Sequence, residues 1–79
     1  MKERIKKLIA EYKKLLSETE ENKKYLEIEY ARLKDNFDYD IEQKKMKINT
    51  SIIRLSVEIK YCKKIIKELE DIIKWSTQS

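Results

Sequence analysis

The chain has 79 residues, with no Gly, no Pro, no His and one Cys, and its 19 basic and 15 acidic residues give a formal net charge of +4. Without Gly and Pro it lacks the residues that tight turns and sheet corners usually need, which predicts a single all-α unit. Its one Cys cannot form an internal disulfide. A chain this short buries little core by itself, so we expect helix packing and self-association to stabilise it.

The first predicted element is a helix over about residues 2–34. Apolar or bulky side chains recur every seven residues along it, the spacing of a coiled-coil seam. The two predicted rows of this seam are Ile5, Tyr12, Thr19, Leu26 and Leu33, and Leu8, Leu15 and Asn22. Thr19 and Asn22 make one layer polar, which indicates either a layer that fixes the register or a local bend where Ser17 and Glu20 have capping-box spacing. We expect the helix to be continuous.

A turn is predicted next, at about residues 35–40. Three Asp residues and one Asn lie within it, and their short polar side chains compete for backbone hydrogen bonds and disfavour helix interiors. We expect Asn36 to provide a left-handed cap, and Asp40 with Gln43 to start the second helix as a capping box. The alternative is one uninterrupted coiled-coil helix of about 120 Å, since apolar side chains persist through this stretch.

The second predicted helix spans about residues 41–75, and its seven-residue repeat is stricter. Its seam consists of Ile48, Ile52, Leu55, Ile59, Cys62, Ile66, Leu69 and Ile73, with Ile41 before it and Ile65 and Ile72 widening it. Two helices of similar length joined by a short turn can pack antiparallel with matched ends. The predicted fold is therefore an all-α antiparallel two-helix coiled-coil hairpin over residues 1–79, which oligomerises.

The sequence offers few groups for catalysis or metal binding. It has no His, no glycine-rich phosphate loop, no zinc-ligand spacing and no calcium-loop pattern. Cys62 falls within the predicted seam, which favours a buried structural thiol over a reactive one. We therefore expect no enzymatic activity, no cofactor, no metal and no small-molecule ligand.

A lysine stripe on the second helix allows a nucleic-acid interpretation. Lys60, Lys63, Lys67 and Lys74 lie on neighbouring faces of that helix, and further basic residues occur near the N-terminus. Such a stripe can neutralise phosphates. Lysines beside a seam more often cover the core with their alkyl stems, and the few arginines argue against base recognition, so nucleic acid is not the favoured ligand.

A second apolar stripe is the most informative feature of the sequence. At 100° per residue, Met46, Ile53, Val57 and Tyr61 cluster opposite the seam of the second helix, and Trp75 shares their azimuth near its end. One neighbouring helix cannot cover both sides. The stripe therefore predicts contact either with further copies of the chain or with a different, larger protein.

These features predict a non-enzymatic helical module that binds proteins. In length and composition, though in no motif, the chain resembles small accessory proteins of phages and mobile elements, which implies inhibition or modulation of a larger host complex, such as a defence system, by occupying its surface. One alternative is a structural homo-oligomeric coiled-coil scaffold, and another is a lysine-rich nucleic-acid accessory protein. With no secretory signal or membrane-spanning run, we expect a cytoplasmic location.

Overall fold

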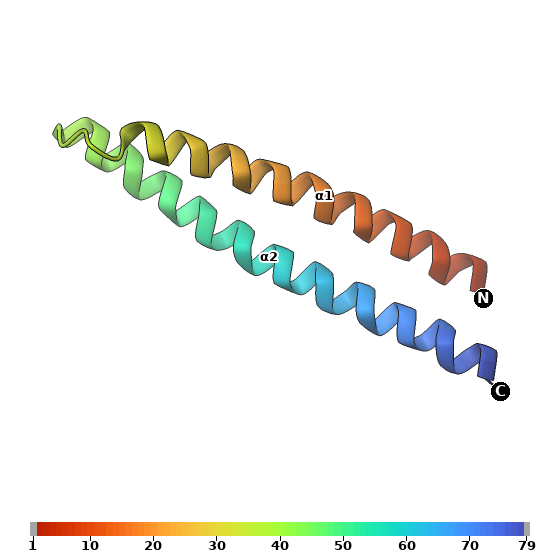
Figure 1. Ribbon diagram of the computed structural model, residues 1–79. Coiled ribbons are helices and arrows are strands. Elements are labelled where there is room, and N and C mark those ends of the chain that lie inside the picture. The colour runs from red at the N-terminus through yellow and green to blue at the C-terminus, as the bar shows by residue number, and fades with distance from the viewer. Residues whose placement is uncertain (1, 79) are drawn as a thin grey trace.

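The computed structural model describes residues 2–78, with side chains described through residue 76, and consists of two helices (Figure 1). Helix α1 spans Lys2–Leu33 and helix α2 spans Tyr39–Gln78. They run antiparallel, with a short loop at one end and both termini at the other. The Cα atoms extend over 62 × 14 × 13 Å, about half the length of one uninterrupted helix. The predicted helical hairpin is confirmed, and the single long helix is excluded.

The loop between the helices turns without glycine by using side-chain hydrogen bonds. No described residue has a positive φ, so the left-handed cap predicted at Asn36 is wrong. Instead, the backbone N–H of Asp38 donates to Asn36 Oδ1 at 3.2 Å, a local turn that Asn side chains favour. The C=O of Asp38 then accepts from the N–H of Glu42 at 2.8 Å. Asp38 therefore precedes the first turn of α2, and the capping-box start predicted at Asp40 and Gln43 is wrong.

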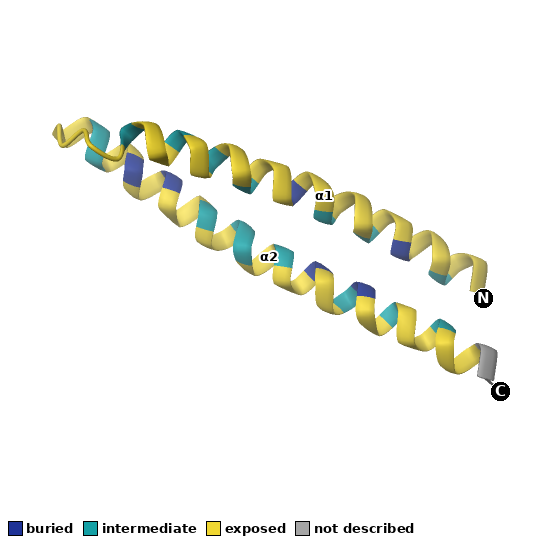
Figure 2. Cartoon of the chain, viewed as in Figure 1, coloured by how far each residue is buried: buried dark blue, intermediate teal, exposed yellow. Residues whose placement is uncertain are grey.

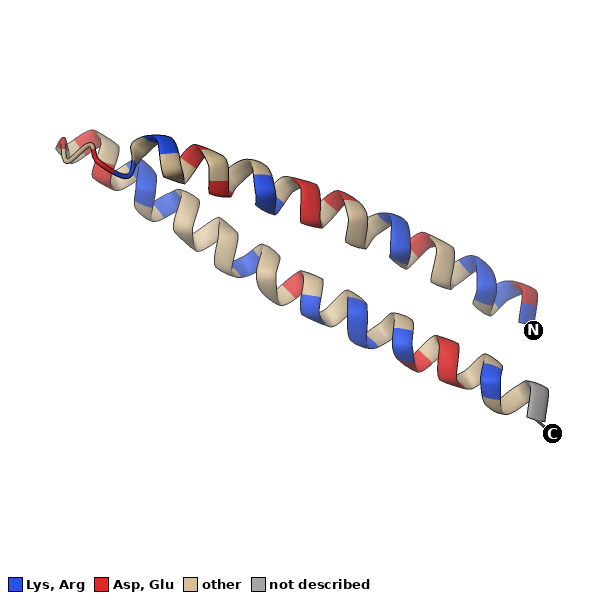
Figure 3. Ribbon diagram, in the orientation of Figure 1, with Lys and Arg blue, Asp and Glu red and all other residues tan. Residues whose placement is uncertain are grey.

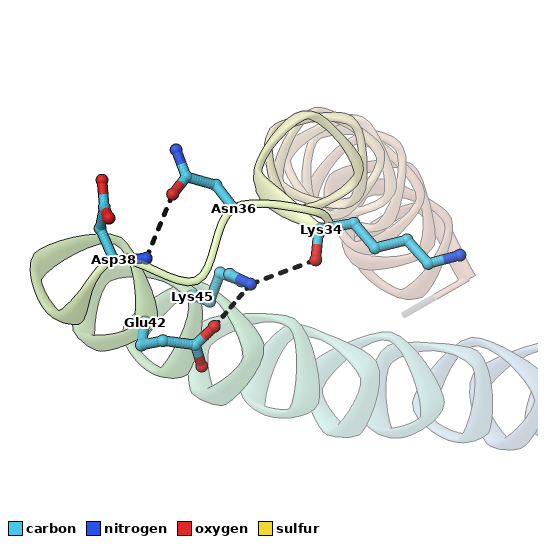
Figure 4. Close-up of polar contacts among 5 residues, drawn as sticks. All are labelled: Lys34, Asn36, Asp38, Glu42 and Lys45. Atoms are coloured by element: carbon cyan, nitrogen blue, oxygen red, sulfur yellow. Dashed lines mark hydrogen bonds and ion pairs between the residues drawn. The ribbon is translucent and has the colours of Figure 1, made fainter.

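Lys45 ties the first turns of α2 to the end of α1 (Figure 4). Its side chain is buried, with only 7% of the residue exposed. Its Nζ donates to the backbone C=O of Lys34 at 3.2 Å and lies 2.7 Å from a carboxylate oxygen of Glu42. The same Nζ lies 4.9 Å from the centroid of the Phe37 ring. Because the last carbonyls of a helix lack internal partners and carry partial negative charge, this ammonium group stabilises the C-terminal end of α1.

Helix α2 turns its predicted seam towards α1 (Figure 2). Ile48, Cys62 and Ile66 are buried. The other members of the predicted α2 seam are half-buried, namely Ile52, Leu55, Ile59, Leu69 and Ile73. Their partial exposure follows from the architecture, because a single neighbouring helix covers only one side of each residue in the seam.

In α1, one of the two predicted rows is misplaced. The row that begins at Ile5 faces α2, but the row that alternates with it contains the buried Ile9 and the half-buried Leu16. Leu8 and Leu15, which were predicted for that row, are exposed. Apolar residues occur here in adjacent pairs, so the seven-residue repeat fits either member of each pair. The prediction selected the wrong member.

The predicted polar layer of α1 is satisfied within the helix. Thr19 is only 5% exposed, and its Oγ1 donates to the backbone C=O of Leu15 at 2.8 Å. Asn22 is exposed and lies outside the seam, so its predicted place there is wrong. Because the Thr19 hydroxyl bonds within its own helix, it needs no hydrogen-bond partner from α2. The layer therefore does not fix the register between the helices, and α1 runs unbroken through it.

Candidate protein-docking surface

Four large apolar side chains form an outer stripe on α2, defined as Met46, Ile53, Val57 and Tyr61. Each of them is more than half exposed. Their helical positions place them away from the seam, and the stripe extends about 22 Å along the helix axis. Trp75, which was predicted to belong with them, is 73% exposed but lies about 21 Å beyond Tyr61, at the open end of the hairpin. The structure therefore brings the stripe together without Trp75.

The part of α2 that carries the outer stripe is poor in charge. Between residues 48 and 57, Arg54 is the only charged side chain (Figure 3). Thr50 and Ser56 bond to backbone carbonyls one turn earlier in α2, those of Met46 and Ile52, at 2.9 and 2.8 Å. Depletion of charge is typical of the centre of a protein interface. This segment therefore combines exposed apolar area with few groups that would have to be desolvated on docking.

One long edge of the hairpin is polar, and we define it by Lys13, Glu20, Glu27, Lys63 and Glu70. Lys13 Nζ and a Glu70 carboxylate oxygen lie 3.8 Å apart across the two helices. Glu20, Glu27 and Lys63 line an open hollow of about 580 Å³ further along the same edge. Acidic and basic groups alternate between the helices here, as is usual for side chains that flank a coiled-coil seam.

The opposite edge is apolar, and we define it by Leu8, Leu15, Tyr61, Ile65 and Ile72. Its centre is a groove of about 340 Å³ between the helices. The residues that line this groove are Tyr12, Leu15 and Thr19 from α1, and Val57, Glu58, Tyr61, Cys62 and Ile65 from α2.

Sequence reasoning missed the apolar edge because it assigned four of its five members to the seam and the fifth, Tyr61, to the outer stripe. Leu8 and Leu15 were placed in the α1 seam, and Ile65 and Ile72 were expected to widen that of α2. The signal was present in the adjacent apolar pairs, since only one member of each pair can enter a narrow seam. The second member must then lie on a flank of its helix.

The structure places the predicted lysine stripe on an exposed side of α2. Lys60, Lys63, Lys67 and Lys74 are exposed and extend from the middle of α2 towards the open end of the hairpin, where the basic N-terminal turn of α1 also lies (Figure 3). Acidic residues of α2 interrupt this region, and the acidic members of the polar edge stand beside Lys63. The resulting surface has mixed charge, whereas phosphate binding favours a continuous basic one.

The described residues contain no group of three or more Cys, Asp or Glu side chains placed to hold a metal ion. Cys62 is a buried free thiol at the apolar groove. Within residues 2–78, neither helix contains a stretch with the length and apolar character needed to cross a membrane. No protein-family model, curated protein or solved structure matches the chain. Its function is therefore inferred from the surfaces described above.

Proposed function

We propose that the chain is a non-enzymatic protein-binding module that docks the outer stripe of α2 into a groove on a larger protein. The observation that carries this proposal is the exposure of four large apolar side chains on a helix whose opposite side already packs against α1. Contiguous apolar patches of this kind usually mark interaction surfaces. Spacings of seven and four residues along the stripe suit a helix that lies lengthwise in an apolar groove.

The chemistry of the stripe favours an adaptable apolar partner surface. Met46 is unbranched and polarisable, so it fits irregular cavities, and Tyr61 combines a flat apolar ring with a hydroxyl that can remain at the rim. Burial of each such side chain contributes about 1.5–3 kcal/mol, whereas association itself costs about 4–15 kcal/mol. The stripe alone therefore supports weak to moderate affinity, and tighter binding requires additional contacts or more than one copy.

Under this proposal the protein acts sterically. A rod 62 Å long occupies a surface of its partner and thereby blocks or alters what else can assemble there. The partner that we propose is a larger host complex, such as a defence system that a phage or mobile-element protein inhibits. The length and composition of the chain support this kind of partner.

The proposal is tested by comparing two charge-matched double variants in affinity capture. Met46→Glu with Ile53→Glu puts two carboxylates into the stripe, whereas Asn49→Glu with Ser51→Glu adds the same charge to exposed positions elsewhere on the same turns. We expect the wild type and the control pair to retain the same partner from lysates of the source cells, identified by mass spectrometry, and the stripe pair to lose it. Retention of that partner by the stripe pair would contradict the proposal.

The homo-oligomeric scaffold predicts a different result from the same variants. If the outer stripe were the contact between copies, Met46→Glu with Ile53→Glu would lower the molecular mass in solution. A nucleic-acid accessory protein predicts instead that binding falls steeply with salt and is lost when Lys60, Lys63 and Lys67 are replaced by Gln. Light scattering and a salt titration therefore distinguish the three functions.

A further inference from the structure

We infer that a second copy of the chain covers the apolar edge, so that two hairpins pair into a four-helix assembly. The apolar edge differs from the outer stripe but borders it, and Val57 and Tyr61 of the stripe also line the groove of the edge. The groove between Leu15 and Ile65 is the starting point for this inference.

The apolar residues of the edge are matched across the two helices. Leu15 and Ile65 both line the groove. Because the helices are antiparallel, one heptad back from Leu15 on α1 is level with one heptad forward from Ile65 on α2. These positions are Leu8 and Ile72, which are 39% and 49% exposed. The edge is therefore a continuous two-helix surface in the open half of the hairpin, not a set of isolated side chains.

The core within one hairpin is thin. Among the described residues, the apolar side chains that count as buried are Ile9, Ile48, Cys62 and Ile66, and none is fully enclosed. A chain of this size without disulfides or metals usually needs additional burial to remain folded. The molecule that packs against the apolar edge must then be present whenever the protein is folded. A second copy of the chain meets that condition, since it is present wherever the first copy is.

The area available suits a pair of identical chains. An aromatic side chain buries roughly 150–250 Å², and burial of an aliphatic one, worth about 1.5–3 kcal/mol, corresponds to roughly 60–120 Å². On this scale, the exposed fractions of Leu8, Leu15, Tyr61 and Ile72 and of their apolar neighbours Val57 and Trp75 leave on the order of 300–600 Å² of apolar surface. A stable interface buries about 800 Å² on each partner, part of which is a polar rim. An interface of two copies about a two-fold axis uses the same patch twice, so one apolar edge per chain is sufficient.

Pairing through this edge leaves Met46 and Ile53 uncovered, because their helical positions point towards the outer side of α2. Each dimer then presents Met46 and Ile53 twice, and the second docking event on a symmetric or repeated partner becomes intramolecular. Self-association and partner docking share Val57 and Tyr61, which line the groove. Leu15 and Ile72 serve only the pairing, and Met46 and Ile53 serve only the docking. Pairing and docking can therefore be tested separately.

The experiment is sedimentation equilibrium of the full chain from roughly 1 μM to 1 mM, with fluorescence of its single tryptophan recorded over the same range. We expect the mass to approach twice 9.7 kDa. The emission of Trp75, which is 73% exposed in one hairpin, should shift to shorter wavelength as the dimer forms. Leu15→Glu with Ile72→Glu should raise the dissociation constant at least about tenfold, because two carboxylates would be buried.

Met46→Glu with Ile53→Glu is the matched control, and its mass should equal that of the wild type. A wild-type mass of 9.7 kDa with constant emission over the whole range would overturn the inference. So would a dimer that tolerates Leu15→Glu with Ile72→Glu, or one that the control pair dissociates. If circular dichroism shows that the glutamate pair is unfolded, Leu15→Gln with Ile72→Gln replaces it, and the wild-type measurements stand without any variant. Partner capture by a monomeric chain would leave the proposed function intact.

Discussion

The two long edges of the hairpin occupy equivalent positions beside the same seam, yet their chemistry is opposite. The polar edge carries side chains such as Lys13 and Glu70, which remain more than half exposed while they pair. The apolar edge carries Leu8, Leu15, Ile65 and Ile72 in the corresponding places. An exposed ion pair contributes at most about 1 kcal/mol, whereas burial of one aliphatic side chain contributes about 1.5–3 kcal/mol. Under the inferred pairing, a second copy therefore packs against the apolar edge, while the side chains of the polar edge remain in water.

The largest effect is expected in the seam, on which both edges rest. Ile66 is 7% exposed, and Ile66→Ala should lower the free energy of unfolding by about 2–4 kcal/mol through lost burial and the cavity left behind. Urea denaturation followed by circular dichroism measures this change. Ile53→Ala, made at an exposed position of the same helix, should cost less than about 1 kcal/mol. Equal losses for the two variants would show that the seam lies elsewhere.

The next effect concerns the loop end of the hairpin, where Lys45 contacts the end of α1. Lys45→Met keeps most of the side-chain volume but leaves the C=O of Lys34 without its donor, so we expect a loss of about 1–2 kcal/mol in the free energy of unfolding. Thermal unfolding of the variant provides the measurement. Lys44→Met removes the same charge at the neighbouring exposed position and should be nearly neutral. A neutral Lys45→Met would mean that the ammonium group contributes nothing to the turn.

A smaller difference distinguishes the apolar edge from the seam within α1. In dilute protein, Leu16→Ala should cost about 1 kcal/mol more than Leu15→Ala, because Leu16 faces α2 and Leu15 lies on the edge. Urea denaturation at several protein concentrations measures both losses. If a second chain covers the edge, the cost of Leu15→Ala should grow with concentration while that of Leu16→Ala changes less. The reverse order would restore the seam originally predicted for α1.

The smallest effect is expected on the polar edge. A double-mutant cycle of Lys13→Gln and Glu70→Gln should give a coupling free energy below about 0.5 kcal/mol, because both side chains are more than half exposed. The coupling should disappear in about 1 M salt, where the Debye length is about 3 Å. A coupling of several kcal/mol that survives such salt would mean that this edge is covered as well.

The hairpin could be predicted because residues within the turn itself indicate where the first helix ends. The Asp and Asn residues of the loop disfavour helix, while the flanking seven-residue repeats favour it on both sides. The details of the turn were missed because a side-chain hydrogen bond stabilises it, whereas glycine with a positive φ usually allows such a turn. Asn36 acts through its Oδ1 rather than through a left-handed φ, and Asp38 rather than Asp40 accepts the first helical hydrogen bond.

The surfaces were harder to predict, because periodicity places a residue on a face but does not choose between adjacent apolar residues. The α2 stripe could be assigned because the stricter seven-residue repeat of α2 places Ile52 in the seam and leaves Ile53 outside it, on the same side as Met46 and Val57. In α1, the choice between Leu15 and Leu16 depends on how the two helices pack, which is a tertiary property. The burial of Lys45 could have been predicted from its position seven residues before Ile52, because a lysine in the seam is buried and needs a polar partner.

Because α1 and α2 run in opposite directions, the first turn of α1 and the last turns of α2, which carry Trp75, lie at the same end of the hairpin, far from the loop (Figure 1). An affinity tag or fluorescent fusion attached at either end would stand next to the apolar edge and crowd whatever packs there. The loop between α1 and α2, at the far tip of a rod 62 Å long, offers a site for labels and surface immobilisation that leaves both the edge and the outer stripe accessible.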